Sequence, residues 1–502
     1  MEKLLSFIWP IKKEELGKFL PLAFMLFLTI LNYKILKSTK DSLIVPAIGA
    51  EAVNFIKFYL VIPSAILFTM LYMRIANLFY FKQIYFGIGL TFTMFFLVFG
   101  FVIYPNQEAL HPSLEKIQAL INTEIILLGF KLHLSHLKWF LLIYSKWSYA
   151  LFYVLADLWG SIMIFVMFWQ FSNQIIPTNQ AKRFYPMINL IGSAGTFCAG
   201  FFMEFFTNAQ AIAGNETNTV FLIKTLISVA AIATLLLLLL FTFMNNVILA
   251  KDRYIGELKA TKIKEKLSFF KSLKIVFSSK YIGYIVVLVL CYGMAINLLE
   301  GPWKAEIKKL YPTTNSYMNF MGTVFKYNGL LAIIFSIIGV TLLKKYSWFV
   351  TALVTPVIIF ITGIVFYAVL VFSDFSNLFL GTLLNIDILV VTVVLGAVIN
   401  IFAQSSKFGL FDSTKEMTYI PIGSELKSKG KAVIDVLGSR FAKSLSAFIQ
   451  SLLFIIFPFA TYSTIVPFLM IVFILIAIIW ILDIRLLNKA YLKHLNKLEN
   501  SN

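Results

Sequence analysis

Long apolar stretches constrain this sequence more than any other feature. A helix that crosses the hydrocarbon of a bilayer needs about 20 mostly apolar residues, and the 502-residue chain holds about twelve such stretches. They lie near 18–38, 53–77, 83–104, 139–176, 184–207, 219–248, 281–300, 317–343, 347–372, 384–408, 433–460 and 463–487. A content of 60% hydrophobic and 13% charged residues also excludes an ordinary water-soluble globule. We therefore predict an all-α membrane protein.

Two of these stretches carry a specific expectation about where the helix ends. The fourth, 139–176, is too long for one perpendicular span, so it is expected to tilt, to break near Trp159 and Gly160, or to project from the bilayer. The seventh, 281–300, is expected to close with Glu300, which places that carboxylate near the membrane surface.

Basic residues alternate between the two ends of the expected helices. They concentrate in the N-terminus, the loop of Arg74 and Lys82, the pair Lys182 and Arg183, the long 249–280 connector, the pair Lys344 and Lys345, the 409–432 loop and the C-terminal tail. The loops near 208–218, 373–383 and 461–463 have neither Lys nor Arg. The positive-inside rule then puts both termini in the cytoplasm and explains the net charge of +19 without nucleic-acid binding. A basic loop near 301–316, on the expected outer side, breaks the pattern.

The connector 249–280 divides the apolar stretches into two sets of six. Residues 1–17 form the expected cytoplasmic N-terminus, 18–248 and 281–487 the two six-helix bundles, and 488–502 the cytoplasmic tail. Two such halves joined by a charged cytoplasmic connector are typical of major-facilitator-type transporters. We expect about twelve membrane helices in this arrangement.

Several charged residues lie within the apolar stretches, where each costs about 2.5–3.5 kcal/mol and is a functional candidate by default. They are Lys57, Asp157, Glu300, Lys326, Arg440 and Lys443, with Lys34 and Lys37 near the end of the first stretch. Lys34, Lys37 and Lys57 could instead extend to the interface. Asp157 is too short to do so. Because lysines from both halves outnumber the acids, we expect a cavity of positive potential that favours an anion such as a phosphate.

Motifs for chemistry are missing from the sequence. It has no GxxxxGK[ST] phosphate loop, no GxGxxG after a strand, and no HExxH or CxxC. The two cysteines, Cys198 and Cys291, lie in apolar stretches and suit packing. We expect a transporter rather than an enzyme, with no cofactor, no metal site and no nucleic-acid partner.

Several sequence blocks, which recur in order over almost the whole chain, resemble the ATP/ADP translocases of obligate intracellular bacteria and plant plastids. The similarity is greatest to the paralogues of rickettsia-type bacteria. The blocks are STKDSLIVPAIGAEAVNFIKFYLVIPSA, KWSYALFYVLADLWGSIMIFVMFWQFSNQI, AKRFYPM, INLLEGPWKAEIKKLYP, SSKFGLFDSTKEMTYIPIGSELKSKGKAVIDV and GSRFAKSLSAFIQS.

This resemblance implies roles for individual residues. The charged positions that matter for transport in the family fall on Lys57, Asp157, Glu300 and Lys443, with the two lysines on the phosphates and the two acids as gate or charge-pair residues. The family usually has Glu where this chain has Asp157. It often has an Asn near the base where this chain has Ser193, and Asn189, one turn earlier, is the substitute. Lys326 and Arg440 are secondary candidates.

The activity that the resemblance implies is exchange of host ATP for bacterial ADP, or import of another nucleotide, by alternating access across the inner membrane of an intracellular bacterium. Nucleotides and the lipid bilayer are then the partners. The alternative is a major-facilitator transporter of a different solute, proton-coupled through Asp157 and Glu300. The sequence leaves open the preferred base, exchange against net import, co-transport of phosphate or protons, and the oligomeric state.

Overall fold

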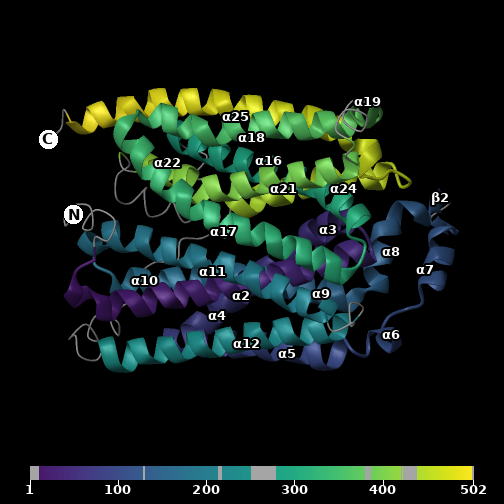
Figure 1. The fold of residues 1–502 in the computed structure, drawn as a ribbon, viewed down its shortest axis with the longest axis horizontal. Coiled ribbons are helices and arrows are strands. Elements are labelled where there is room, and N and C mark those ends of the chain that lie inside the picture. Colours follow the sequence, from purple (N-terminus) through teal and green to yellow (C-terminus); the bar gives the residue numbers. More distant parts are fainter. Residues whose placement is uncertain are drawn as a thin grey trace.

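Long helices that run back and forth in one direction make up almost the whole chain in the computed structural model (Figure 1). The structure describes residues 11–127, 130–212, 218–249, 279–378, 385, 387–419, 421 and 438–499. Within these residues, eleven helices are long and apolar enough to cross a membrane, and a twelfth apolar helix is shorter. The predicted all-α membrane fold is confirmed. Most of the 249–280 connector lies outside the described residues.

Six membrane-spanning segments precede residue 250, and we call them the first half. They are α2 (Leu16–Ala47), α3–α4 (Ala50–Phe55 and Ile62–Leu78), α5 (Phe81–Val98), α9–α10 (Trp147–Ser161 and Trp169–Ile175), α11 (Thr178–Ile212) and α12 (Thr219–Phe243). A short 3₁₀ turn, Lys13–Glu15, precedes α2. Most of its connections are short, as expected for antiparallel neighbours in a bundle, and a longer insert joins α5 to α9.

The second half follows residue 278. Its segments are α16 (Lys280–Leu310), α17 (Thr314–Lys345), α18 (Trp348–Val371), α21 (Ile388–Ser406) continuing toward α22 (Asp412–Thr418), the shorter α24 (Ser439–Ile456) and α25 (Tyr462–Glu499). The one-turn helix α19 (Ser373–Ser376) follows α18. Side chains cap three of these helices: Thr313, Ser347 and Asp387 each accept a hydrogen bond from a backbone N–H of the first turn.

A small insert projects from the first half at the end opposite both chain termini, which we call the far end (Figure 1). It contains the short helices α6 (Gln107–Leu110), α7 (Leu114–Ile121) and α8 (Lys138–Ser145) and a 3₁₀ turn, Leu134–Leu137. Its hairpin pairs β1 (Glu124–Leu127) antiparallel with β2 (Phe130–His133). Nothing in the apolar pattern predicted this hairpin.

Three helix ends differ from the sequence-based expectation. Helix α2 continues to Ala47 rather than ending near 38, and α16 continues to Leu310, ten residues beyond Glu300. The fourth stretch breaks at Lys146, between α8 and α9, and stays helical through Trp159 and Gly160. In α2 and α16, polar residues that suggested an interface lie inside the helix, because neighbouring helices supply partners for them.

Several spans contain π-helical segments, in which backbone hydrogen bonds skip one more residue than in an α-helix. They include Ile56–Val61 between α3 and α4, Ile162–Phe168 between α9 and α10, and Lys407–Phe411 after α21. Two others, Phe99–Ile103 and Met244–Ile248, follow α5 and α12. Pro63 follows the first of them and has no N–H to donate, so the regular ladder is interrupted there. Such segments are rare and often occur at functional sites. The segment Ile56–Val61 carries Lys57.

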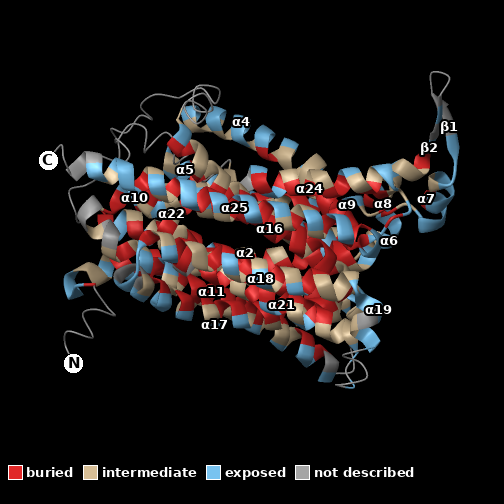
Figure 2. Ribbon diagram, turned by 90° about the horizontal axis from the view of Figure 1, so that it is seen from above, coloured by how far each residue is buried: buried red, intermediate tan, exposed pale blue. Residues whose placement is uncertain are grey.

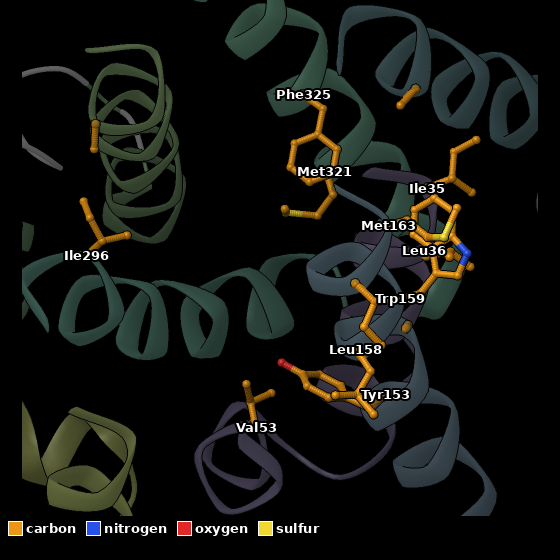
Figure 3. Close-up of a cluster of buried hydrophobic side chains, with 14 of the residues drawn as sticks. Ile35, Leu36, Val53, Tyr153, Leu158, Trp159, Met163, Ile296, Met321 and Phe325 are labelled. Carbon is orange, nitrogen blue, oxygen red and sulfur yellow. The ribbon is translucent and has the colours of Figure 1, made fainter. Parts of the chain in front are cut away.

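The two halves pack together through an interior of large apolar side chains. Figure 2 shows buried residues concentrated where helices face each other, with exposed residues around the periphery. Figure 3 shows Ile35 and Leu36 of α2, Trp159 of α9 and Phe325 of α17 in one cluster of buried side chains. Helices α11 and α17, one from each half, approach closely along a seam because glycines line it. A Cβ atom on Gly200 would overlap the backbone of Gly322.

Candidate functional site

Helix α2 carries four charged side chains into the bundle: Lys34, Lys37, Lys40 and Asp41. The spacings of three and four residues place them on neighbouring positions of one helix face. Lys34 is buried, and its ammonium donates to Gln404 Oε1 of α21 at 3.2 Å while lying 4.8 Å from the Phe325 ring. The alternative in which Lys34 extends to the membrane interface is therefore wrong.

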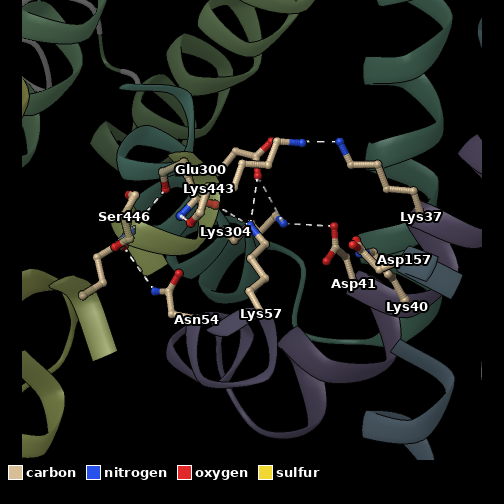
Figure 4. A network of polar contacts seen from close by, with 12 residues as sticks. Lys37, Lys40, Asp41, Asn54, Lys57, Asp157, Glu300, Lys304, Lys443 and Ser446 are labelled. Carbon is tan, nitrogen blue, oxygen red and sulfur yellow. Dashed lines mark hydrogen bonds and ion pairs between the residues drawn. The ribbon is translucent and has the colours of Figure 1, made fainter. Parts of the chain in front are cut away.

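Glu300 of α16 lies among three lysines from three helices (Figure 4). Its carboxylate oxygens are 3.5 Å from Lys57 Nζ, 3.8 Å from Lys304 Nζ and 4.0 Å from Lys37 Nζ. Lys57 also donates to Asn297 Oδ1 of α16 at 2.5 Å. Because α16 continues past Glu300, this carboxylate lies inside the bundle and is not the helix-end group that the sequence suggested.

Two further ion pairs adjoin Glu300. Lys304 Nζ is 2.9 Å from Asp41 Oδ2, which joins α16 of the second half to α2 of the first. Lys40 forms a close ion pair with Asp157 of α9, and its ammonium lies 3.9 Å from the centre of the Tyr153 ring. We call the seven residues of these pairs the charge cluster: Lys37, Lys40, Asp41, Lys57, Asp157, Glu300 and Lys304.

The charge cluster holds four lysines and three carboxylates, so it is positive by one formal charge. Lys443 of α24 adds a further ammonium beside it (Figure 4), and its backbone carbonyl accepts a hydrogen bond from Asn297 Nδ2 at 3.4 Å. In the low dielectric of a helix bundle such an excess favours an anion. Lysine ammonium groups suit phosphate in particular.

Exposure within the charge cluster changes along the helix axes. The side chains of Lys37, Lys57 and Glu300 retain 18, 15 and 14% of their exposure, whereas Lys304, Lys40 and Asp41 retain 4, 3 and 1%; Asp157, the partner of Lys40, is the exception at 34%. Helices α2 and α16 both begin at the end that holds the chain termini, so Lys304 and Asp41 lie on the far-end side of Lys37 and Glu300 (Figure 1). The halves are therefore tightly joined on that side.

A set of uncharged hydrogen bonds between the halves lies beside the charge cluster, next to Gly301 of α16. Asn54 Nδ2 of α3 donates to the Tyr462 hydroxyl of α25 at 2.6 Å and to Gln450 Oε1 of α24 at 3.2 Å. The Tyr462 hydroxyl in turn donates to Gln450 Oε1 at 3.1 Å. Gly301 leaves room for this contact, since a Cβ there would overlap Tyr462 and Gln450. We call Asn54, Gln450 and Tyr462 the far-end closure.

The remaining sequence candidates lie elsewhere. Lys326 pairs with Glu204 on the α11/α17 seam at 2.6 Å. Ser193 is buried and donates to the Asn189 carbonyl at 3.0 Å, while Asn189 is exposed. Among the described contacts, the side chains of Ser193 and Asn189 form no hydrogen bond with the charge cluster. The side chain of Arg440 lies outside the described part of the structure.

Sequence reasoning missed Lys40 and Asp41 of the charge cluster and placed Lys304 near the outer surface. Lys40 and Asp41 lie in the block STKDS, and Lys304 lies in INLLEGPWKAEIKK. Both blocks were assigned to helix ends. The predicted basic loop near 301–316 is mostly part of α16, for a related reason. Lys304 is buried in that helix, Lys309 pairs with Glu306, and the connection to α17 holds no lysine. The usable signal was the adjacent pair Lys40 and Asp41. Two opposite charges next to each other in an otherwise apolar helix both need partners on neighbouring helices.

Comparison with known proteins decides the family. The model of the TLC ATP/ADP transporter family matches residues 1–491. The chain belongs to this family. ADP,ATP carrier protein 3 of Rickettsia prowazekii (strain Madrid E) is 42% identical to this TLC family member over 503 residues, which covers 98% of each chain. ADP,ATP carrier protein 4 of Rickettsia felis is 39% identical and covers 97% of this chain and 94% of its own.

Solved structures show the fold of this TLC family member independently. The nucleoside transporter NupG aligns with a TM-score of 0.54 at 11% identity, over 93% of this chain and 99% of its own. A bacterial homologue of the iron transporter ferroportin, in an inward-facing state, aligns with a TM-score of 0.53 at 14% identity over 95 and 98%. At these identities the likeness concerns the major-facilitator-like fold alone, and that prediction is confirmed.

Proposed function

We propose that this TLC family member is a nucleotide antiporter that exchanges ATP of a host cell for ADP of an intracellular bacterium by alternating access. The observation that carries the proposal is the charge cluster, because its lysines come from both halves and outnumber its carboxylates. A polyanion that binds there contacts both halves at once. Family membership and the names of the rickettsial relatives support ATP and ADP as that polyanion.

Within the site, Lys57 and Lys443 are the proposed phosphate ligands. Lys57 lies on the π-helical segment of the first half and Lys443 on α24 of the second, so a phosphate chain between them bridges the halves. Asp157 and Glu300 are the proposed gate residues, paired with Lys40 and with Lys57 in the absence of nucleotide. Ser193 and Asn189 remain the proposed base contacts. Another nucleotide base fits the same phosphate site.

Competition for lysines links binding to opening in this proposal. Phosphate oxygens draw Lys57 and Lys37 from Glu300, whose oxygens they approach at only 3.5 and 4.0 Å. Glu300 then has Lys304 as its remaining cation, and Lys304 is the residue that holds Asp41. Occupancy therefore weakens the Lys304–Asp41 contact between the halves. A substrate that interacts differently with two states shifts their populations in this way.

The alternative function, a proton-coupled transporter of another solute, uses Asp157 and Glu300 as protonation sites. Both carboxylates form ion pairs with lysine ammonium groups. Protonation of either one would remove the charge on which its ion pair depends. Uptake that depends on pH but ignores excess nucleotide would favour this alternative.

The proposed location is the bacterial inner membrane, with both termini in the cytoplasm. Both chain ends lie at the same end of the bundle in Figure 1, where the basic N-terminus and tail also lie. The proposed organisation keeps two bundles, 18–248 and 281–487, joined by the 249–280 connector. The last helix, α25, continues into the tail as far as Glu499.

Counter-exchange in proteoliposomes tests the function. Vesicles preloaded with ADP should take up labelled ATP, and empty vesicles should not. A panel of ATP, ADP, GTP, CTP, UTP and NAD in the competing position identifies the base. Nucleotide uptake that proceeds equally into empty vesicles would contradict exchange and indicate net import.

The variants Lys57→Ala and Lys443→Ala test the site. Each removes a charged hydrogen bond to phosphate worth about 1.5–3 kcal/mol, so we expect an increase in the KM for ATP of roughly 10- to 100-fold. Lys224→Ala is the matched control, because Lys224 lies on α12 with its ammonium over the ring of Phe101, away from the charge cluster. Unchanged exchange by both variants would remove the phosphate role.

A further inference from the structure

A second charged site lies on the α11/α17 seam, apart from the charge cluster. Glu204 Oε2 of α11 is 2.6 Å from Lys326 Nζ of α17, so the pair joins the two halves. Both side chains retain about a quarter of their exposure, at 26 and 27%. Two further contacts follow the seam toward the far end: Asn319 donates to Asn208 at 2.8 Å and Asn315 to Gln210 at 3.4 Å.

The exposed side of this ion pair opens onto a pocket at the periphery of the bundle. The pocket has a volume of about 260 Å³ and is lined by Glu204, Lys326, Asn208, Phe201, Phe205 and Ile212. Phe201, Phe205 and Ile212 are 50, 54 and 89% exposed. Large apolar side chains that are this exposed in a membrane-spanning helix face lipid tails. The ion pair therefore borders lipid rather than the interior of the bundle.

The pair lies inside the hydrocarbon, toward its far-end surface. Helix α17 has 32 residues, and at 1.5 Å per residue it is about 48 Å long against a hydrocarbon core of about 30 Å. Lys326 lies twelve residues, or about 18 Å, from the far-end start of α17 at Thr314. With the excess length shared between both ends, the pair lies about 9 Å below the hydrocarbon surface. Lysine side chains point toward the helix N-terminus, here the far end, and so extend toward the headgroups.

We propose that this pocket binds a zwitterionic phospholipid with a primary ammonium headgroup, of the phosphatidylethanolamine type. Lys326 donates to the lipid phosphate, and Glu204 accepts from the lipid ammonium. The exposed Phe201 and Phe205 contact the acyl chains. Each protein charge thus meets the opposite charge of the headgroup. Without the lipid, Lys326 and Glu204 compensate only each other within the hydrocarbon.

Charge complementarity also sets the selectivity. A choline headgroup carries a quaternary ammonium without N–H, so it cannot donate to Glu204. A glycerol headgroup leaves the lipid a net anion, which Lys326 attracts and Glu204 repels. The pocket should therefore rank phosphatidylethanolamine above phosphatidylcholine and phosphatidylglycerol with the same acyl chains.

Native mass spectrometry of the purified full-length chain tests the proposal without any transport measurement. The protein is mixed with equal amounts of the three lipids and released from detergent in the gas phase. We expect phosphatidylethanolamine to be retained roughly 10- to 100-fold over phosphatidylcholine, the effect of one charge-assisted hydrogen bond. Equal retention of the two lipids by the unmodified protein would overturn the proposal.

Two variants separate the roles of the pair. Glu204→Gln should abolish the preference for phosphatidylethanolamine over phosphatidylcholine, and Lys326→Gln should lower retention of all three lipids, while Lys326→Arg restores it. Lys224→Gln, which removes another membrane lysine over the Phe101 ring, should leave the ratios unchanged. Thermal melting in detergent shows whether each variant is folded. A folded Glu204→Gln variant with the original lipid preference would refute recognition of the ammonium.

Discussion

The contact between Lys304 and Asp41 allows a prediction about which partner matters more. Lys304→Met removes the cation 2.9 Å from Asp41 Oδ2 and leaves a carboxylate that is 1% exposed. Asp41→Asn leaves Lys304 with a second carboxylate, Glu300, at 3.8 Å. We therefore expect Lys304→Met to destabilise the protein more than Asp41→Asn does.

The magnitudes follow from what each variant leaves buried. Removal of one partner from a buried ion pair costs about 3–5 kcal/mol, because the other charge is left uncompensated, and Lys304→Met falls in this range. Asp41→Asn keeps a cation–anion contact and loses one charged hydrogen bond, which gives about 1–3 kcal/mol. The double variant should cost less than the sum of the two, by a coupling energy of about 0.5–3 kcal/mol.

SDS-induced unfolding of the purified variants measures these free energies. An exchange of the two charges, Asp41→Lys with Lys304→Asp, is a sharper control, since the carboxylate placed at position 304 lies next to Glu300 and is repelled by it. We expect this double variant to remain destabilised. Full recovery of stability by the exchange, or a larger loss from Asp41→Asn than from Lys304→Met, would refute the shared-lysine geometry.

Three further predictions concern the seam, the far-end closure and the insert. Gly200→Val should prevent α11 from approaching α17 and lower the melting temperature, because its side chain meets the Gly322 backbone; Gly283→Val, with open space around it, should not. Tyr462→Phe leaves two amide side chains of the closure without their shared hydroxyl and should cost about 1–3 kcal/mol in SDS unfolding. Burial, aided by the charge of a nearby lysine, lowers the pKa of His111 from 6.5 to about 4. The stability that neutral His111 contributes above pH 6.5 is lost as the pH falls toward 4, since the unfolded chain binds the proton first. The melting temperature of a His111→Asn variant should therefore depend less on pH in that window.

The apolar pattern located the helices well, because burial in lipid demands unbroken runs of apolar residues. It failed at helix ends that lie next to another helix. The STKDS segment of α2 and the KAEIKK segment of α16 appear interfacial when each helix is considered alone. In the bundle, Lys304 of one segment pairs with Asp41 of the other, so both helices continue. Helix extent there depends on a partner more than 260 residues away in sequence.

For Lys57 and Lys326 a position within the apolar stretches was predictable, but the direction of each side chain was not. Lys57 and Lys326 are both lysines within apolar stretches, and both are half-buried. One lies among the charges between the halves, and the other pairs with Glu204 at the lipid-facing seam. A rotation of about 100° per residue decides between such faces. Because both faces of these helices are apolar, the sequence has no polar stripe to fix that rotation.

The order of contact strengths around Glu300 gives the proposed cycle its direction. Glu300 holds its three lysines at 3.5–4.0 Å, whereas Lys304 holds Asp41 at 2.9 Å. A nucleotide that entered from the terminal end would meet the loosely held Lys37 and Lys57 first, since these remain partly exposed. Only after they turn to phosphate does Glu300 compete with Asp41 for Lys304. The Lys304–Asp41 contact between the halves is then weakened by an occupied site and left intact by an empty one, which is the condition that exchange requires. Asp41→Asn removes that competition, so we expect it to raise uptake into vesicles that contain no ADP relative to exchange. A ratio equal to that of the unmodified protein would separate Lys304 from the coupling.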